Sequence, residues 1–122
     1  MMENQAYFKE RREYPRVFMD LPLDYSVKYD PRTRGGIVID ASETGFLIYS
    51  TEDIPIGTKL RIAVFFPWDH ELANLEVSAE VIWKRAADKW GEGYQYGIKF
   101  SQISQEDYSK LRQLLIEKLL ND

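Results

Sequence analysis

The chain has 122 residues, a formal net charge of −4 and no cysteine, which fits one domain and excludes disulfides and thiol-ligated metals. Its hydrophobic fraction of 44% predicts a packed core rather than a disordered chain. The acidic balance argues against the extended basic surface that DNA and RNA binders use. No apolar run approaches the ~20 residues of a membrane span, and the polar N-terminus lacks a secretory h-region, so we expect a cytoplasmic protein.

Residues 1–13 are polar and charged, with few apolar anchors. We interpret them as a flexible N-terminal arm that precedes a folded unit of residues 14–122. Pro15 disfavours helical backbone at Tyr14, so we expect the chain to become extended where the arm meets the folded unit.

Six strand signals follow in chain order. Alternating or β-branched residues, separated by Gly and Pro turns, predict strands at 23–29, 37–39, 46–49, 60–66, 75–83 and 94–100. In the first of these, every second side chain from Leu23 to Tyr29 would share one face. Residues 67–70 are expected to break the fourth strand. Short strands at this spacing predict an antiparallel barrel or sandwich.

The C-terminal segment changes to a helical period. Ser104 is a candidate N-cap, with Asp107 as its reciprocal partner at the third helical position. Apolar side chains then recur at helical spacing at Tyr108, Leu111, Leu115 and Leu119. These features predict one amphipathic helix at about 105–120, packed on the sheet or on a partner, so the expected fold class is all-β with a C-terminal helix.

Two short motifs carry the functional prediction. Arg12 and Arg16 stand four residues apart as R-x-x-x-R, and Asp40, Ser42 and Gly45 form D-x-S-x-x-G between two strand signals. In this order they resemble the two halves of the PilZ family signature.

The resemblance to the PilZ family covers nearly the whole chain. AEVIWK at 79–84, YGIKF at 96–100 and the terminal helix resemble the rest of such a domain. It implies a six-stranded antiparallel β-barrel that binds cyclic di-GMP, a bacterial second messenger with two phosphodiesters and two guanines. It also implies ligand contacts from both motifs.

The chemistry of the motif residues is consistent with that ligand. Guanidinium groups make paired contacts to phosphate oxygens and to guanine O6 and N7, and they stack on purine faces. Asp40 can accept from the guanine N1–H and N2–H₂ edge, and Ser42 can donate to phosphate. Gly45 permits a positive φ or a close approach to the ligand. We therefore predict a cyclic di-GMP receptor whose arm becomes ordered on binding and changes the surface presented to an unidentified downstream protein.

Three further positions follow from the resemblance. In the family, an additional arginine at the place of Arg11 tends to accompany two stacked, intercalated ligand molecules, which implies that stoichiometry here. Trp83 and Lys84 match a family position that often lines the ligand. The family frequently has arginine where Lys84 stands, and lysine keeps the charge but loses the fork geometry.

Each of these features also has a structural interpretation. A charged cluster near a terminus is usually a solvated tail, and Asp40 to Ser42 can be a strand end with side-chain turn capping. Trp83 can be a partly buried barrel residue. The functional alternatives are a PilZ-fold protein-interaction adaptor that does not use the nucleotide, and a barrel that binds single-stranded RNA through its aromatics.

An enzyme is not expected. His70 is the only histidine, and the chain has neither a cysteine nucleophile nor a Walker phosphate loop. A lone histidine without neighbouring ligands is a poor metal site, so no metal or cofactor is predicted.

Overall fold

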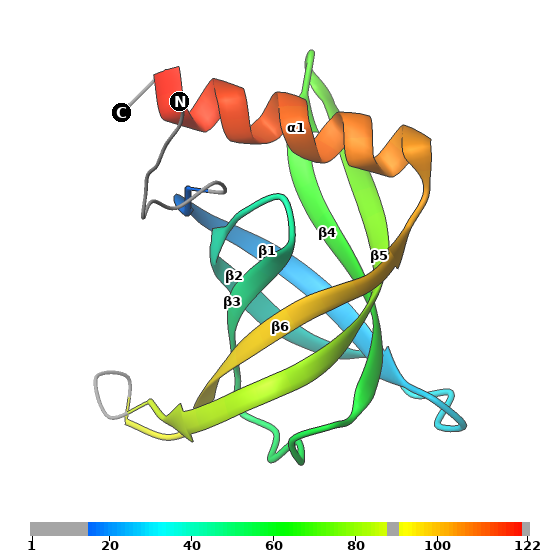
Figure 1. Cartoon of the computed structure of the whole chain (residues 1–122), viewed down its shortest axis with the longest axis vertical. Helices are drawn as coiled ribbons and strands as arrows, with labels where there is room; N and C mark the ends of the chain where they lie inside the picture. Colours follow the sequence, from blue (N-terminus) through cyan, green and yellow to red (C-terminus); the bar gives the residue numbers. More distant parts are fainter. Residues whose placement is uncertain (1–14, 88–90, 121–122) are drawn as a thin grey trace, which may run out of the picture.

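The computed structural model describes residues 15–87 and 91–120. Its elements in chain order are β1 (Val17–Val27), β2 (Arg34–Ala41), β3 (Gly45–Ser50), β4 (Lys59–Trp68), β5 (Glu71–Ala86), β6 (Tyr94–Ile103) and α1 (Gln105–Leu120). The strands pair antiparallel in the order β1-β2-β3-β6-β5-β4, and β4 returns to β1 to close the barrel. Helix α1 lies across one end of the barrel (Figure 1). The predictions of six antiparallel strands and one C-terminal helix are confirmed.

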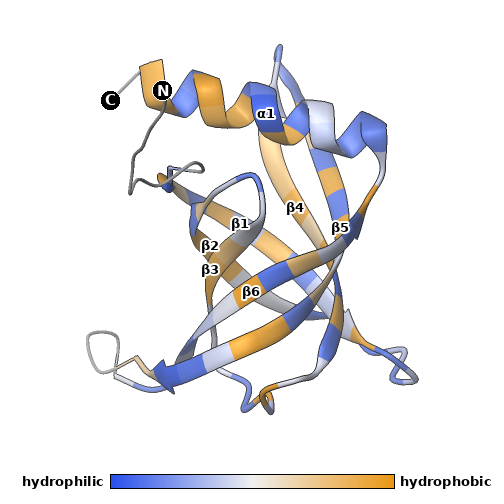
Figure 2. Ribbon diagram, viewed as in Figure 1, coloured by the Kyte–Doolittle hydropathy of each residue, from blue (hydrophilic) through white to orange (hydrophobic). Residues whose placement is uncertain are grey.

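The core fills the barrel because the strands alternate between buried and exposed residues. In β1 every second side chain from Val17 to Tyr25 is buried. Figure 2 shows hydrophobic residues along the strands, whereas the β1–β2 and β4–β5 turns are mainly hydrophilic. Helix α1 contacts β1 and β5 and closes the core with Leu111, Leu114 and Leu115. Burying each of these leucines contributes about 1.5–3 kcal/mol, which explains why α1 docks on the barrel.

The start of α1 is capped as predicted. Ser104 Oγ accepts a hydrogen bond from the Asp107 N–H at 3.1 Å, which satisfies one of the free donors of the first turn. The predicted apolar stripe is wrong at its end, because Leu119 is 57% exposed and Leu114 is buried instead. The buried face of α1 is centred on Leu111, Leu114 and Leu115, and within the part of the chain that the structure describes its last turn is exposed at Leu119 and Leu120.

Strand β1 begins six residues earlier than the sequence pattern indicates. Pro22 hides this extension, because proline usually argues against a strand. At Pro22 the strand pairs only with β2, since its pairing with β4 begins at Leu23, so the missing N–H is tolerated. Tyr29, predicted to share one face of the strand with Leu23, is instead 93% exposed in the following turn with a φ of 71°, and that prediction is wrong.

The predicted break at residues 67–70 is also wrong in part. Strand β4 continues through Pro67 to Trp68, beyond its pairing with β1, which ends at Val64. Asp69 and His70 have positive φ angles of 49° and 71° and form a two-residue turn, as tight hairpins require. Within the residues that the structure describes, no helix has the length and hydropathy needed to cross a lipid bilayer.

Candidate functional site

The D-x-S-x-x-G motif forms the turn between β2 and β3, at the end of the barrel that carries α1 (Figure 1). The Ser42 N–H donates to the Gly45 carbonyl at 2.9 Å, and Ser42 Oγ accepts from the Thr44 N–H at 3.2 Å. Ser42 is only 2% exposed. Its hydroxyl therefore shapes the turn, as the structural interpretation expects, and a direct contact from Ser42 to a ligand stays a prediction.

Gly45 is required by close packing between strands. Its φ is not positive, so of the two alternatives for this glycine the left-handed backbone is not the one adopted. A Cβ at Gly45 would lie 3.3 Å from the Ile98 carbonyl carbon of β6 and closer still to its oxygen. Because the obstacle is backbone, no side-chain movement can relieve it. Gly45 therefore allows β3 to approach β6 closely.

Arg16 and Asp40 bring the two motifs together. Arg16 Nε and Nη2 each lie 2.7 Å from Asp40 Oδ1. The Arg16 side chain is 41% exposed and that of Asp40 is 23% exposed, so the pair contributes only about 0.2–1 kcal/mol to stability. A ligand that satisfied both groups would displace this ion pair at low cost. Arg11 and Arg12 lie outside the described residues.

The strand register places Asp40 and Trp83 in one row on the outside of the barrel. Going from β1 to β5, each residue of the row is directly opposite the next: Phe18, Asp40, Leu47, Gly97 and Trp83. Directly opposed residues point to the same face of a sheet. Adjacent strands are about 4.8 Å apart, so Asp40 and Trp83 are separated by about 14 Å along the sheet. We call these five residues the Asp40 row.

Trp83 lies over Gly97 in this row. A Cβ at Gly97 would be 2.5 Å from the indole Cδ1 and closer to two other indole atoms, so the glycine makes room for the ring. Trp83 stays 39% exposed, and the Arg85 guanidinium carbon lies 5.5 Å from its ring centroid. This is a partly buried aromatic platform, compatible with both the structural and the ligand-lining interpretation.

Lys84 is not brought to the Asp40 row. Consecutive strand residues point to opposite faces, and Lys84 Nζ instead contacts the Asp53 carboxylate and lies 4.5 Å from the Tyr94 ring centroid. The carboxylate of Asp53, in the loop after β3, pairs with the Lys84 charge, so no ligand is needed to account for this lysine.

Glu43 is a residue of the motif turn that the sequence pattern does not single out. The Tyr108 hydroxyl donates to Glu43 Oε1, and Arg112 Nε lies 3.6 Å from the same oxygen. Both partners belong to α1, so this carboxylate ties the motif turn to the helix. A variable position of a short motif gives no sequence signal for such a contact, which depends on how α1 crosses the barrel end.

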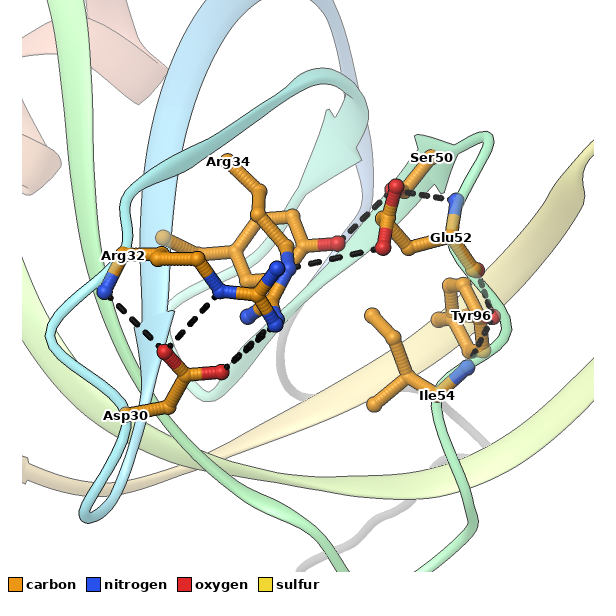
Figure 3. A network of polar contacts seen from close by, with 8 residues as sticks. Asp30, Arg32, Arg34, Ser50, Glu52, Ile54 and Tyr96 are labelled. Carbon is orange, nitrogen blue, oxygen red and sulfur yellow. Dashed lines mark hydrogen bonds and ion pairs between the residues drawn. The ribbon is translucent and has the colours of Figure 1, made fainter.

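A second polar cluster, drawn in Figure 3, lies around the turns at the end of the barrel opposite α1 (Figure 1). Asp30 accepts hydrogen bonds from Arg32 and Arg34. These bonds hold the pKa of the Asp30 carboxyl well below its usual range, and the bonds from Arg32 have the largest effect. Arg34 also reaches Glu52, at 3.4 Å. The cluster joins the β1–β2 and β3–β4 turns.

Two buried tyrosines continue this cluster into the barrel. Tyr25 and Ser50 share a hydrogen bond at 2.9 Å. The Tyr96 hydroxyl donates to the Glu52 carbonyl at 2.5 Å and accepts from the Ile54 N–H at 2.8 Å. Burial raises the pKa of the Tyr96 hydroxyl to about 12. These two hydrogen-bonded tyrosine hydroxyls help to close the barrel end that α1 does not cover.

A family model described as "PilZ domain" matches residues 10–117 of the chain. No curated protein matches the chain significantly. The fold is similar to that of the inhibitor of motility MotI/DgrA from Bacillus subtilis, with a TM-score of 0.78 and 21% identity. That match covers 93% of this chain and 53% of MotI/DgrA, so the chain spans about half the length of that protein.

Two other solved structures similar to the chain contain cyclic di-GMP. The PilZ domain of YcgR from Escherichia coli with cyclic di-GMP has a TM-score of 0.69 and 14% identity, over 92% of this chain and 94% of that one. The MrkH–cyclic di-GMP complex from K. pneumonia has a TM-score of 0.66 and 13% identity, over 91% of this chain and 52% of that one. At these identities the likeness establishes a shared fold.

Proposed function

This chain belongs to the PilZ domain family, and from that membership and the geometry of its outer face we propose that it is a receptor for cyclic di-GMP and acts as a binding module rather than an enzyme. The observation that carries the proposal is the convergence of Arg16 of the first motif on Asp40 of the second, in a row that continues to Trp83. This places a cation, an acceptor and an aromatic ring along one face.

The ligand would replace the contact between Arg16 and Asp40. Arg16 turns its guanidinium to a phosphate or to guanine O6 and N7, and Asp40 accepts from the guanine N1–H and N2–H₂ edge. Each charge-assisted hydrogen bond contributes about 1.5–3 kcal/mol net. Four or five such bonds give micromolar affinity or better, about −8 kcal/mol, after the cost of association.

The N-terminal arm would supply the remaining cations. Arg12 stands four residues before Arg16, and Arg11 adds one more charge. Closing this arm over the ligand contributes charge-assisted bonds and alters the surface offered to a downstream protein. With Arg11 present, we expect two intercalated ligand molecules per chain, so Arg11→Ala should change the stoichiometry more than it abolishes binding.

A nucleotide-independent adaptor is the second candidate, and one observation favours it. Arg16 and Asp40 already satisfy each other, and Ser42 is committed to its turn. On this alternative the motifs hold the barrel together and a partner protein recognises the surface whether or not nucleotide is present.

Isothermal titration calorimetry with cyclic di-GMP tests the proposal. Arg16→Ala and Asp40→Ala should each weaken binding at least tenfold, about 1.4 kcal/mol. Arg61→Ala is a matched control, because Arg61 forms a comparable exposed ion pair with Glu76 at 2.9 Å outside the Asp40 row. The absence of binding heat for the intact chain, or equal losses for Arg16→Ala and Arg61→Ala, would reject the receptor and leave the adaptor.

A further inference from the structure

An apolar hollow lies beside the Asp40 row. It has a volume of about 390 Å³ and is lined by Phe18, Asp20, Ile37, Ile39 and Tyr49 from β1, β2 and β3. Phe18 is 62% exposed and Ile37 is 38% exposed. Large apolar side chains grouped at a surface hollow often mark a binding site. Phe18 belongs to both the hollow and the Asp40 row, so the hollow continues the proposed site.

Two β-bulges meet at this hollow. In the pairing of β1 with β2, Met19 and Asp20 together oppose Ile39. In the pairing of β2 with β3, Ile39 is itself the additional residue. Asp20 has a φ of 53°, a left-handed conformation that costs energy for a residue with a side chain. Bulges are frequent next to binding sites, where they redirect a side chain, and this one places a carboxylate at the border of the hollow.

The dimensions of the hollow favour a small ligand over a protein. A stable protein interface buries about 800 Å² on each partner, far more than five residues provide. Pockets for small molecules begin at about 300 Å³ and combine apolar walls with a few polar groups. Phe18 offers an aromatic face and Asp20 a hydrogen-bond acceptor. A flat heterocycle with N–H donors on its edge fits this pair, and guanine has both N1–H and N2–H₂ donors, whereas adenine has no N1–H.

We propose that the hollow is a purine subsite that binds one guanine base of the cyclic dinucleotide, with the base stacked on Phe18 and its N1–H and N2–H₂ edge directed to Asp20. This inference rests on the proposed function and extends it, because it names residues outside both family motifs. It makes Asp20 a determinant of selectivity for guanine over adenine, in addition to Asp40.

Calorimetry of matched variants with cyclic di-GMP tests the subsite. Base–aromatic stacking contributes about 1–3 kcal/mol per base, so Phe18→Ala should weaken binding at least about fivefold, and Phe18→Trp should restore it. Asp20→Asn should narrow the preference for cyclic di-GMP over cyclic di-AMP at least about fivefold. Leu72→Ala is the control, because Leu72 is 77% exposed at the far end of β5 and should leave affinity unchanged.

A nuclear Overhauser measurement between the guanine H8 proton and the Phe18 ring then reports the contact directly. If the intact chain binds no nucleotide, the proposed function fails and the subsite fails with it. If the intact chain binds but Phe18→Ala keeps its affinity, the subsite alone is rejected. Contacts from Phe18 to the N-terminal segment of the same chain, or to a second copy, in the nucleotide-bound state would also reject it by showing a different occupant.

Discussion

Replacing Gly97 by alanine should destabilise the barrel through a single identifiable contact. The added Cβ would lie 2.5 Å from Cδ1 of the Trp83 indole and closer to two other ring atoms, whereas carbon atoms pack at about 3.5–4.0 Å. The ring must therefore withdraw by more than about 1 Å from a position in which most of its surface is buried. Overpacking of this size costs about 1–3 kcal/mol, and we expect about 2 kcal/mol for Gly97→Ala.

A double-mutant cycle isolates the cause. In a Trp83→Ala background the obstacle is gone, so Gly97→Ala should cost less than about 0.5 kcal/mol, the usual range for a substitution that meets no obstacle. Gly45→Ala is the matched comparison, because its Cβ meets the Ile98 backbone and its cost should be the same in both backgrounds. Urea unfolding followed by far-ultraviolet circular dichroism measures each free energy of unfolding. An undiminished cost of Gly97→Ala in the Trp83→Ala background would show that the indole contact is not the cause.

Three other predictions concern stability. Ser104→Ala removes the acceptor for the Asp107 N–H and should lower the free energy of unfolding by about 1 kcal/mol in urea titrations, whereas Ser104→Asp should keep it. Glu43→Ala leaves the Tyr108 hydroxyl without this acceptor and Arg112 without this carboxylate, and should lower it by about 1–3 kcal/mol; an undiminished cost in a Tyr108→Phe background would contradict the assigned contact with Tyr108. Because the folded Tyr96 has a pKa of about 12 against an unfolded value of 10, the unfolded chain loses its proton first and stability should fall from about pH 10 to 12; Tyr96→Phe should flatten that fall.

The parts of the fold that depend on local patterns could be predicted from the sequence. Alternating apolar residues mark the strands, and Ser104 with the helical period marks α1. The strand boundaries that the sequence pattern misses, those of β1 and β4, depend on which neighbouring strands pair at that point. Pro22 and Pro67 look like strand breakers along the chain, yet each occupies a position where one neighbouring strand is absent. Leu119 has the spacing of a core residue, but among the described residues it stays 57% exposed at the end of α1.

The candidate site likewise contains residues that the sequence identifies and residues whose roles only the structure shows. The motif spacing identified Arg16 and Asp40, and the structure brings them into contact. The role of Gly97 depends on how β5 and β6 align, and the tether from Glu43 depends on the position of α1. Lys84 is adjacent to Trp83 in sequence, but alternation sends its side chain to Asp53 instead. Register and long-range packing, which a single sequence does not reveal, decide these cases.

An amide chemical-shift map of the chain titrated with cyclic di-GMP shows directly whether the nucleotide binds along the Asp40 row. The largest shifts should follow the Asp40 row and its surroundings, from Arg16 and Asp40 to Trp83, and should spare the opposite barrel end around Asp30 and Arg34. Shifts concentrated at that opposite end, or no shifts at saturating nucleotide, would contradict binding along the Asp40 row.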